Sequence, residues 1–495
     1  MAFDFSQNLK KEIYQKLISL KLDIAIRYDR SILGINIQFI DNGEIKLRTL
    51  CMKEIKERHT SEYLKKIILD VLNEHEIRID QIYTITTDNA ANMIKLIKLL
   101  IHHDEEDDED DILNDNLDND NLNNNDDIIV NENEEPFFNI ENINLVPHTR
   151  SMLMGIRCAS HTFQLAMNDC IKNSNEIVII NKARNICKKI RNQTTMSILS
   201  KLNLKKPLID CCTRWNSIYL MLERLLELKN FCQEISAQSN DREKCLSENE
   251  WKIISDILKA LYPSYILTKY IQSEQMTMGD FYAAWIKCIM QTSKIDTSFA
   301  KLLVCTIKAR EINLKNEVFC SAIYLDPRYN VFLSFEEKDI AKKHLYKTWN
   351  LIQNLNNQNI ENLDTIPTCS HSKDNLDDDF EDLLMSHESL NKNSSQGIEN
   401  YNKCVEIEYI IRSFDNIERL EKDANLLNYW GNVKNSMPEL YKLAMVVLAV
   451  PATQVSVERA FFSLKFILSA QRTKLNPEIL ENILVIRSNS LFKNK

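Results

Sequence analysis

The spacing of apolar residues divides the chain into a strand-rich start and a helix-rich remainder. Segments 16–27 and 31–40 are rich in Ile and Leu, which alternate in places with polar residues in the manner of strands. The Asp-Asn-Gly sequence at 41–43 predicts a hairpin turn. We therefore expect 44–52 to be a third strand, paired with the second.

A helix, another strand and another helix are predicted next. Apolar residues in 60–72 recur at the spacing of a buried helix face, 81–87 reads as a short strand, and 90–101 reads as a helix. This order of three strands, helix, strand and helix is the start of a ribonuclease-H-like fold, in which a crossover helix leads to the fourth strand.

The rest of the chain is predominantly helical in pattern. Helical periodicity dominates from about residue 160 to 350, for example in 218–228 and 251–261, and it returns in 405–488. Asn476-Pro477 is a suitable cap and first turn for the last helix. The predicted fold class is α/β plus α, with a ribonuclease-H-like core that is interrupted by a large helical insertion and completed by C-terminal helices.

Two polar segments interrupt this pattern. Segment 104–135 contains 16 Asp or Glu residues and no Lys or Arg, and 356–400 is similarly polar. Both are predicted to be disordered, solvated loops; an acidic arm that competes with DNA for a basic groove is the alternative. Because those 16 negative charges exceed the net charge of −10, the remaining chain carries +6, which permits a nucleic-acid partner without requiring one.

Composition and the N-terminal sequence bear on whether the protein is secreted or spans a membrane. No stretch approaches the roughly 20 uninterrupted apolar residues of a membrane span, and the N-terminus has no secretory signal. The 13 cysteines follow no regular framework, which suits a reducing interior. We expect no membrane association.

Three acidic residues carry the candidate chemistry. Asp23 lies within a predicted strand, Asp88 follows the fourth strand, and Glu458 lies in an otherwise apolar helical stretch. Burying an ionised carboxylate is costly unless a cation or donor compensates it. Three carboxylates at one point would form a hard oxygen site for Mg²⁺ or Mn²⁺, and two such metals can promote displacement at a phosphodiester.

Each acid also has a simpler explanation. Asp23 could be a strand-edge residue, Asp88 could cap the following helix, and Glu458 could pair with Arg459 or Lys465. The three together are more informative than any one, because the first and fourth strands of the predicted sheet are neighbours.

A series of motifs resembles the hAT family of transposases over residues 18–488, in the family's own order. The motifs are Asp23, TDNAANM at 87–93, RCASH at 157–161, TRWNS at 213–217, the strand-like LDPR at 325–328, SVERAF at 456–461 and RTKL at 472–475. The resemblance implies that Asp23, Asp88 and Glu458 are the catalytic, metal-binding acids of a nuclear enzyme that cuts and joins DNA.

Cys158 and His161 are spaced as a zinc-binding pair would be, but no second pair lies nearby, and structural zinc normally needs four ligands. We therefore expect no zinc. The pair is expected to lie on a helix near the active site, where the resemblance implies contact with DNA.

Trp215 lies between Arg214 and Asn216, so it could stack on an extruded base while its neighbours bind phosphates. The alternative is that Trp215 anchors the following helix in the core. The resemblance to the family favours the stacking role.

Self-association is expected through the C-terminal helices, because the family uses this region both to complete the core and to form dimers. Their apolar faces include Leu440, Leu443, Val447, Leu448, Phe461 and Leu464. An internal helical core is the alternative use of these residues.

These predictions give the following division of the chain: 1–103, first half of the core; 104–140, acidic insert; 141–175, helix with the Cys–His motif; 176–355, helical insertion domain; 356–400, acidic loop; 401–495, dimerisation region and end of the core.

Family members usually carry an N-terminal BED-type zinc finger. None of the 22 residues before Asp23 is Cys or His, so we expect that module to be absent. Two classes of function therefore remain open: a metal-dependent DNA-cleaving enzyme, and a domesticated, non-catalytic dimer that binds DNA or chromatin.

Overall fold

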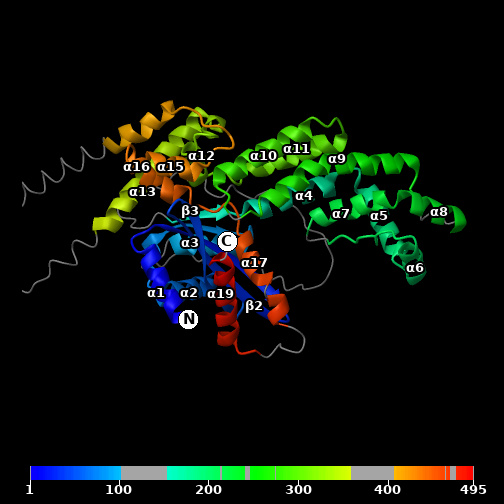
Figure 1. Cartoon of the computed structure of the whole chain (residues 1–495), viewed down its shortest axis with the longest axis horizontal. Coiled ribbons are helices and arrows are strands. Elements are labelled where there is room, and N and C mark those ends of the chain that lie inside the picture. Colours follow the sequence, from blue (N-terminus) through cyan, green and yellow to red (C-terminus); the bar gives the residue numbers. More distant parts are fainter. Residues whose placement is uncertain are drawn as a thin grey trace, which may run out of the picture.

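The computed structural model describes residues 2–101, 153–211, 214–239, 246–273, 275–357, 406–462, 464–468 and 475–493. These residues form a small mixed sheet and a larger set of helices. A helical lobe extends away from the sheet, with α6 (Gln193–Lys201) and α8 (Lys229–Ser239) at its far end (Figure 1). The predicted inserts lie outside the described residues, apart from positions 356–357, which end a helix.

The sheet has five strands in the order β3-β2-β1-β4-β5. β1 pairs antiparallel with β2, and β2 with β3, whereas β4 is parallel to both β1 and β5. The four predicted strands are confirmed; β5 was not predicted, because four residues are too few to show a period. The bounds are β1 (Ile18–Arg27), β2 (Arg30–Asp41), β3 (Glu44–Ile55), β4 (Ile82–Thr87) and β5 (Met154–Arg157).

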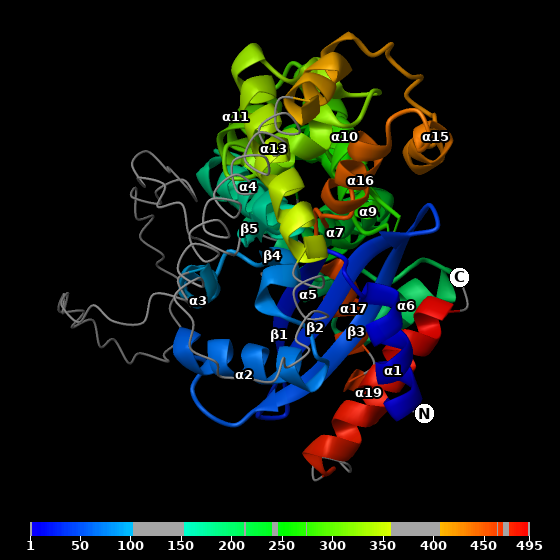
Figure 2. The ribbon, with the colours of Figure 1, turned by 90° about the vertical axis from the view of Figure 1, so that its left-hand side faces the viewer.

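One face of the sheet is apolar and is covered by helices. Leu20 and Leu22 of β1 and Ile35 and Ile37 of β2 are completely buried in this layer. Burial of such side chains contributes about 1.5–3 kcal/mol each relative to exposure. The covering helices are α1 (Ala2–Ile13), α2 (Ser61–Glu74) and α3 (Ala91–Ile101). Figure 2 shows α2 and α3 on one side of the sheet and α17 and α19 on the other.

The opposite face of the sheet is polar. Lys21 and Asp23 alternate with the apolar residues of β1, and the strand register places Asn36 and Gly34 of β2 directly opposite them. Directly paired residues of an antiparallel ladder project to the same face. Asp23 therefore projects to the face that α17 covers.

Segment 449–456 crosses this polar face and satisfies several of its hydrogen-bonding groups. Gln38 Nε2 donates to the carbonyl oxygen of Ala449 at 2.8 Å. Thr86 Oγ1 donates to the carbonyl oxygen of Pro451 at 3.1 Å. These bonds fix the segment that leads into α17 (Val455–Phe462), the helix that carries Glu458.

The helical lobe confirms the predicted helical periodicity. It contains, besides α6 and α8, helices α4 (Ala159–Asn173), α5 (Ile177–Ile190), α7 (Asn216–Glu227), α9 (Glu248–Tyr270), α10 (Met278–Ser293) and α11 (Ser298–Glu311). Phe163 of α4 packs edge-on against both Trp215 and Trp285, with ring centroids 6.2 and 5.3 Å apart. Aromatic contacts thus join α4 to the start of α7 and to α10.

The LDPR motif follows a helix rather than forming a strand, which corrects the strand-like expectation. α12 (Glu317–Tyr324) ends directly before it, and α13 (Phe335–Asn357) follows. Arg328 binds both oxygens of the fully buried Asp326, at 2.9 and 2.7 Å, and also Asp280 of α10 at 2.9 Å. The motif therefore builds a buried ion pair that locks the turn onto α10.

A buried hydrogen-bonded chain joins the sheet to α12 and α13. Tyr83 Oη of β4 lies 2.7 Å from His344 Nε2, and His344 Nδ1 lies 3.1 Å from Glu317 Oε2. Burial lowers the pKa of His344, so the ring is neutral: Nδ1–H donates to Glu317, and Nε2 accepts from Tyr83.

The C-terminal helices return to the sheet. They are α15 (Leu426–Val433), α16 (Pro438–Val447), α17, α18 (Leu464–Ile467) and α19 (Pro477–Lys493). As predicted, α19 begins at Pro477, and Asn476 Oδ1 accepts from the backbone N–H of Glu478 at 2.9 Å.

The apolar residues predicted to form a dimer surface are instead buried within the chain. Each is at most 9% exposed, and they pack in the internal cores: Leu440, Leu443, Val447, Leu448, Phe461 and Leu464. The sequence shows an apolar face but not what covers it, so the alternative of an internal core describes these six residues. Exposed apolar residues of the same region are Phe462, Phe466, Ile479, Ile483 and Ile486.

Across the described ranges, no helix combines the length and the apolar character needed to cross a membrane.

Candidate active site

Asp23 lies near the end of β1 and is partly buried. The backbone N–H of Ile24 donates to its Oδ1 at 2.9 Å. Burial, together with the negative charges of Glu458 and Asp88, raises the pKa of Asp23 to about 7, although His161 opposes this rise. The three acids come from β1, the end of β4 and α17, and the charges of Glu458 and Asp88 both act on Asp23.

Glu458 reaches this region because α17 packs closely on β2. A Cβ atom on Gly34 would lie 2.6 Å from Val457 Cγ1 and 2.9 Å from Phe461 Cζ, so only glycine allows this approach. Gly34 is the register partner of Asp23, and Val457 precedes Glu458. Arg459 does not turn toward the site: its Nη2 donates to the carbonyl oxygen of Gln272, beyond the end of α9.

Asp88 follows β4 and is partly buried. Its Oδ1 accepts a hydrogen bond from the backbone N–H of Ala90 at 3.2 Å, directly before α3. This bond forms an Asx-type turn before α3 and is not a helix cap, because its donor Ala90 precedes the helix.

Cys158 and His161 lie at the start of α4, on the same side as the acids. Cys158 is buried, and its Sγ accepts from the backbone N–H of Gln454 at 3.5 Å. Burial alone would lower the pKa of His161, but the sulfur of Cys158 and the charges of Glu458 and Asp23 outweigh it and raise the pKa to about 9. His161 is therefore a positively charged neighbour of the two acids at neutral pH.

The donor set fits a hard divalent cation, because carboxylate oxygens are the ligands that Mg²⁺ and Mn²⁺ prefer. The arrangement is open, however. Within the described ranges, no three His, Cys, Asp or Glu side chains are close enough together to hold a metal ion. The acids share a region without forming a closed set of ligands.

Trp215 is 2% exposed and lies in the core against Phe163, so its ring is not available to a base in this structure. The core-anchor alternative therefore describes its position, and the stacking role does not. Arg214 is exposed and Asn216 is partly exposed, at the start of α7. Both remain candidates for contact with phosphates.

Two residues of the site were missed in the sequence. Gly34 sets the distance between α17 and β2, and Lys21 is 6% exposed on the same sheet face as Asp23. Lys21 could have been found from the alternation of polar and apolar residues along this strand. Polar Ser19, Lys21 and Asp23 alternate there with apolar Ile18, Leu20 and Leu22.

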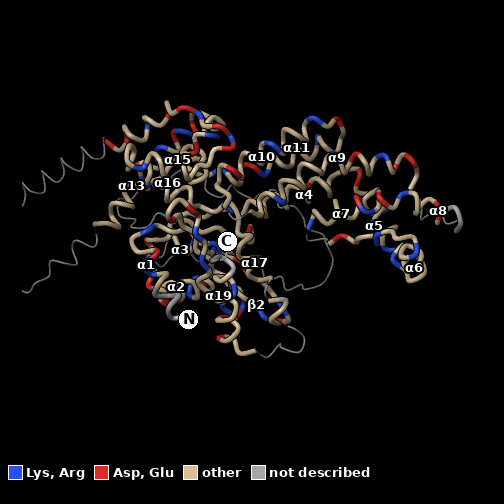
Figure 3. The backbone as a smooth tube through the Cα atoms, viewed as in Figure 1, with Lys and Arg blue, Asp and Glu red and all other residues tan. Residues whose placement is uncertain are grey.

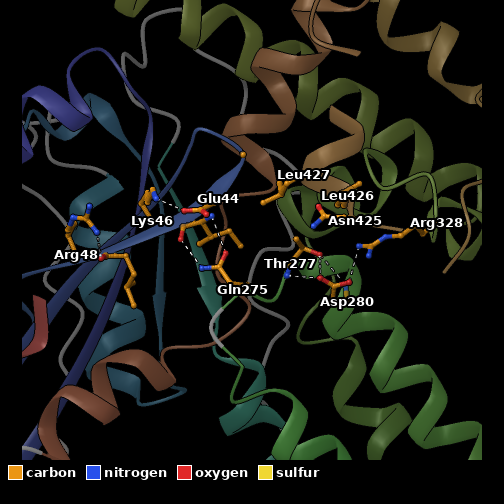
Figure 4. Close-up of a pocket in the computed structure, with 13 residues that line it drawn as sticks. Glu44, Lys46, Arg48, Gln275, Thr277, Asp280, Arg328, Asn425, Leu426 and Leu427 are labelled. Atoms are coloured by element: carbon orange, nitrogen blue, oxygen red, sulfur yellow. Dashed lines mark hydrogen bonds and ion pairs between the residues drawn. The ribbon is translucent and has the colours of Figure 1, made fainter. Parts of the chain in front are cut away.

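A separate cavity of about 720 Å³ lies between the β2–β3 hairpin and the helical lobe (Figure 4). Its charged groups are paired: Lys46 with Glu44, Arg48 with Glu12, and Arg328 with Asp280. None of the three candidate acids lines it. We assign no ligand to this cavity.

Two family models match the chain. Residues 406–490 match the hAT family C-terminal dimerisation region, and residues 156–260 match the ZBED1 RNase-like helical domain. The first match contains Glu458 and the second contains His161 and Trp215.

Several curated proteins are similar in sequence. The human zinc finger BED domain-containing protein 4 is 24% identical over 68% of this chain and 29% of its own length. A putative transcriptional regulator, tpeD, of Talaromyces stipitatus is 21% identical over 98% of this chain and 56% of its own. The putative AC transposase of Zea mays is 23% identical over 66% and 43%. The chain spans less than two thirds of the length of each.

The matched dimerisation region and these relatives define a transposase-derived protein that contains a self-association region. The chain belongs to the hAT family.

Proposed function

We propose that Asp23, Asp88 and Glu458 bind divalent cations and that the protein cleaves and joins DNA strands on a ribonuclease-H-like core. The observation that carries this proposal is the placement of three elements far apart in the sequence: β1 with Asp23 pairs with β4, which Asp88 follows, and α17 with Glu458 packs against β1 and β2. The strand order β3-β2-β1-β4-β5 supports the core, since β1 and β4 are neighbours.

Within this proposal each residue has a chemical role. A cation held by the three carboxylates would polarise a phosphodiester and lower the pKa of an attacking water or 3′-hydroxyl. Asp23 must lose its proton to bind the cation, and an adjacent positive charge favours that loss. His161 carries a proton at neutral pH and could donate it to a phosphate oxygen.

The charge of the helical lobe supports DNA as the partner. Residues 172–214 contain ten Lys or Arg and only two acidic residues, Glu176 and Asp210. Figure 3 shows basic positions along α5 and α6, toward the far end of the lobe. Such a surface attracts a phosphate backbone without reading sequence. The proposal places the protein in the nucleus, where chromosomal DNA lies.

The matched dimerisation region supports self-association. We propose that the contact uses the exposed Phe462 and Phe466, whose rings lie 5.4 Å apart, together with exposed isoleucines of α19. These residues extend the buried core of α17 and α18 to the surface.

A second candidate is a non-catalytic dimer that binds DNA. Two observations favour it: the carboxylates form no closed set of three ligands in the described residues, and one relative is named as a transcriptional regulator. Both candidates use the same scaffold and differ in whether the acids assemble around a cation.

Cleavage of a hairpin or flapped DNA in Mn²⁺ separates the two candidates. We expect wild-type protein to nick the DNA and Glu458→Gln to lose the activity, while Glu478→Gln, which removes an exposed charge at the start of α19, retains it. Equal cleavage by wild type and Glu458→Gln would show a contaminating nuclease. Binding without cleavage by wild type would favour the non-catalytic dimer.

A further inference from the structure

An exposed aromatic face runs along the last turns of α9. Tyr262 is 54% exposed and Tyr270 is 44% exposed, and the partly exposed Tyr265 and the exposed Lys269 lie between them. At 100° per residue these four positions occupy a single arc of the helix. We call Tyr262, Tyr265, Lys269 and Tyr270 the tyrosine face.

The central ring of this face, that of Tyr265, is ordered by contacts with Lys269 and with α7. Tyr265 stacks on Tyr219 of α7, with ring centroids 4.4 Å apart and an interplanar angle of 16°. Lys269 Nζ lies 4.2 Å from the centroid of the Tyr265 ring. Tyr262 and Tyr270 lie on either side of this ordered ring along the same helix, and both are exposed.

The tyrosine face ends beside the candidate active site. α9 ends at Tyr270, and two residues later the carbonyl oxygen of Gln272 accepts the hydrogen bond from Arg459. Arg459 is the neighbour of Glu458 on α17. Tyr270 is therefore the end of the tyrosine face nearest the contact with α17, and Tyr262 lies about two helical turns, or roughly 12 Å, further along α9.

The chemistry of this face suits an unpaired nucleic-acid strand. Every base has a flat face that can stack on an aromatic ring, whereas bases in a duplex are already stacked on one another. Lys269 and Arg459 supply positive charge for the backbone phosphates at the same surface. Trp215, the ring that the sequence suggested for stacking, is buried one turn before Tyr219.

We propose that the tyrosine face stacks the bases of a single DNA strand that enters or leaves the candidate active site. This inference rests on the proposed function, because it needs DNA at the three carboxylates. It assigns to α9 the base-stacking role that the sequence had suggested for Trp215.

The test measures binding rather than cleavage. Full-length Glu458→Gln protein is titrated, without divalent metal, against a fluorescein-labelled duplex with a ten-nucleotide overhang and against the same duplex with blunt ends. Tyr262→Ala/Tyr270→Ala is compared with Tyr262→Phe/Tyr270→Phe, which keeps both rings. Tyr409→Ala, at a residue 75% exposed outside the tyrosine face, is the matched control.

We expect the double alanine variant to bind the overhang DNA at least tenfold more weakly and the blunt duplex within about twofold. The phenylalanine variant and Tyr409→Ala should bind both as the parent does. Because Tyr262 and Tyr270 are exposed, all variants should fold, which circular dichroism checks.

Other outcomes overturn the inference in distinguishable ways. If the parent binds neither DNA, the proposed function fails and the inference fails with it. If the parent binds both DNAs and the double alanine variant changes nothing, or weakens both equally, only the stacking role fails. Weaker self-association of the double alanine variant in sedimentation without DNA would assign the tyrosine face to a second copy of the chain.

Discussion

Gly34→Ala should disturb the candidate site from a distance, because the new methyl group would lie between β2, which pairs with the strand of Asp23, and α17, which holds Glu458. The added Cβ would be 2.6 Å from Val457 Cγ1, 2.9 Å from Phe461 Cζ and 3.2 Å from Met52 Sδ. Carbon atoms pack at about 3.5–4.0 Å, so α17 must move by about 1 Å. Val457 is β-branched and fully buried, so it cannot turn aside.

The energetic effect follows from two opposing terms. Overpacking costs about 1–3 kcal/mol. Replacement of a glycine restricts the unfolded chain and returns about 0.4–1 kcal/mol. We expect a net loss of roughly 1–2 kcal/mol in the free energy of unfolding. A shift of about 1 Å in a catalytic group can also lower a rate on the order of 100-fold.

Urea unfolding and hydrogen exchange of α17 measure both effects. Gly431→Ala is the control, because no atom lies within 4 Å of its added Cβ on α15, and it should be neutral or slightly stabilising. In the double variant Gly34→Ala/Val457→Ala the closest of these contacts is removed, so its loss should be smaller than the sum of the single losses. Additive losses, or a Gly34→Ala protein as stable as wild type with unchanged exchange, would refute the reasoning.

Three further predictions concern other parts of the molecule. Phe462→Ser/Phe466→Ser should weaken self-association at least tenfold in sedimentation and leave the unfolding midpoint nearly unchanged, because both rings are exposed. Asp326→Asn should lower the free energy of unfolding by about 3–5 kcal/mol, because it removes the fully buried partner of Arg328. The pKa of His344 in the folded protein is below its value in the unfolded chain, so its contribution to the free energy of unfolding is present above pH 6.5 and is lost as the pH falls below 6.5. Urea unfolding at pH 7.5 and 5.5 should therefore show a smaller loss of stability on acidification for His344→Gln than for wild type.

Each of these three predictions has an outcome that would contradict it. An unchanged dimer in the phenylalanine variant would place the contact elsewhere. A loss below about 1 kcal/mol for Asp326→Asn would mean that Asp280 alone compensates Arg328. A His344→Gln protein with the same pH dependence as wild type would mean that other groups cause it.

The sequence alone was sufficient to predict the helices and strands that have a strong local pattern of apolar residues. The strands of the β2–β3 hairpin and the crossover helix were predictable because their apolar residues repeat with the period of the element, and Asn42 and Gly43 adopt the left-handed turn conformations that their residue types favour. The prediction that Asp23 and Asp88 lie near each other rested on neighbouring strands, and β1 and β4 do pair. β5 was too short to show a period.

Features that depend on tertiary contact were not predictable. An apolar stripe such as Leu440–Val447 looks the same whether a second chain or the chain's own sheet covers it, and here the chain's own core does. The sequence shows that Trp215 and the tyrosines of α9 are aromatic, but it does not show which of them are buried. In the fold Trp215 is buried and Tyr262 is exposed. The role of Gly34 depends on a helix more than 400 residues away.

Binding of Mn²⁺ tests most directly whether the three acids share one cation. Titration calorimetry of the full chain should show binding that weakens by at least about tenfold in each of Asp23→Asn, Asp88→Asn and Glu458→Gln, and that is unchanged in Glu478→Gln. Binding of equal strength in wild type and Glu458→Gln would contradict the account, because α17 would then contribute nothing to the metal site.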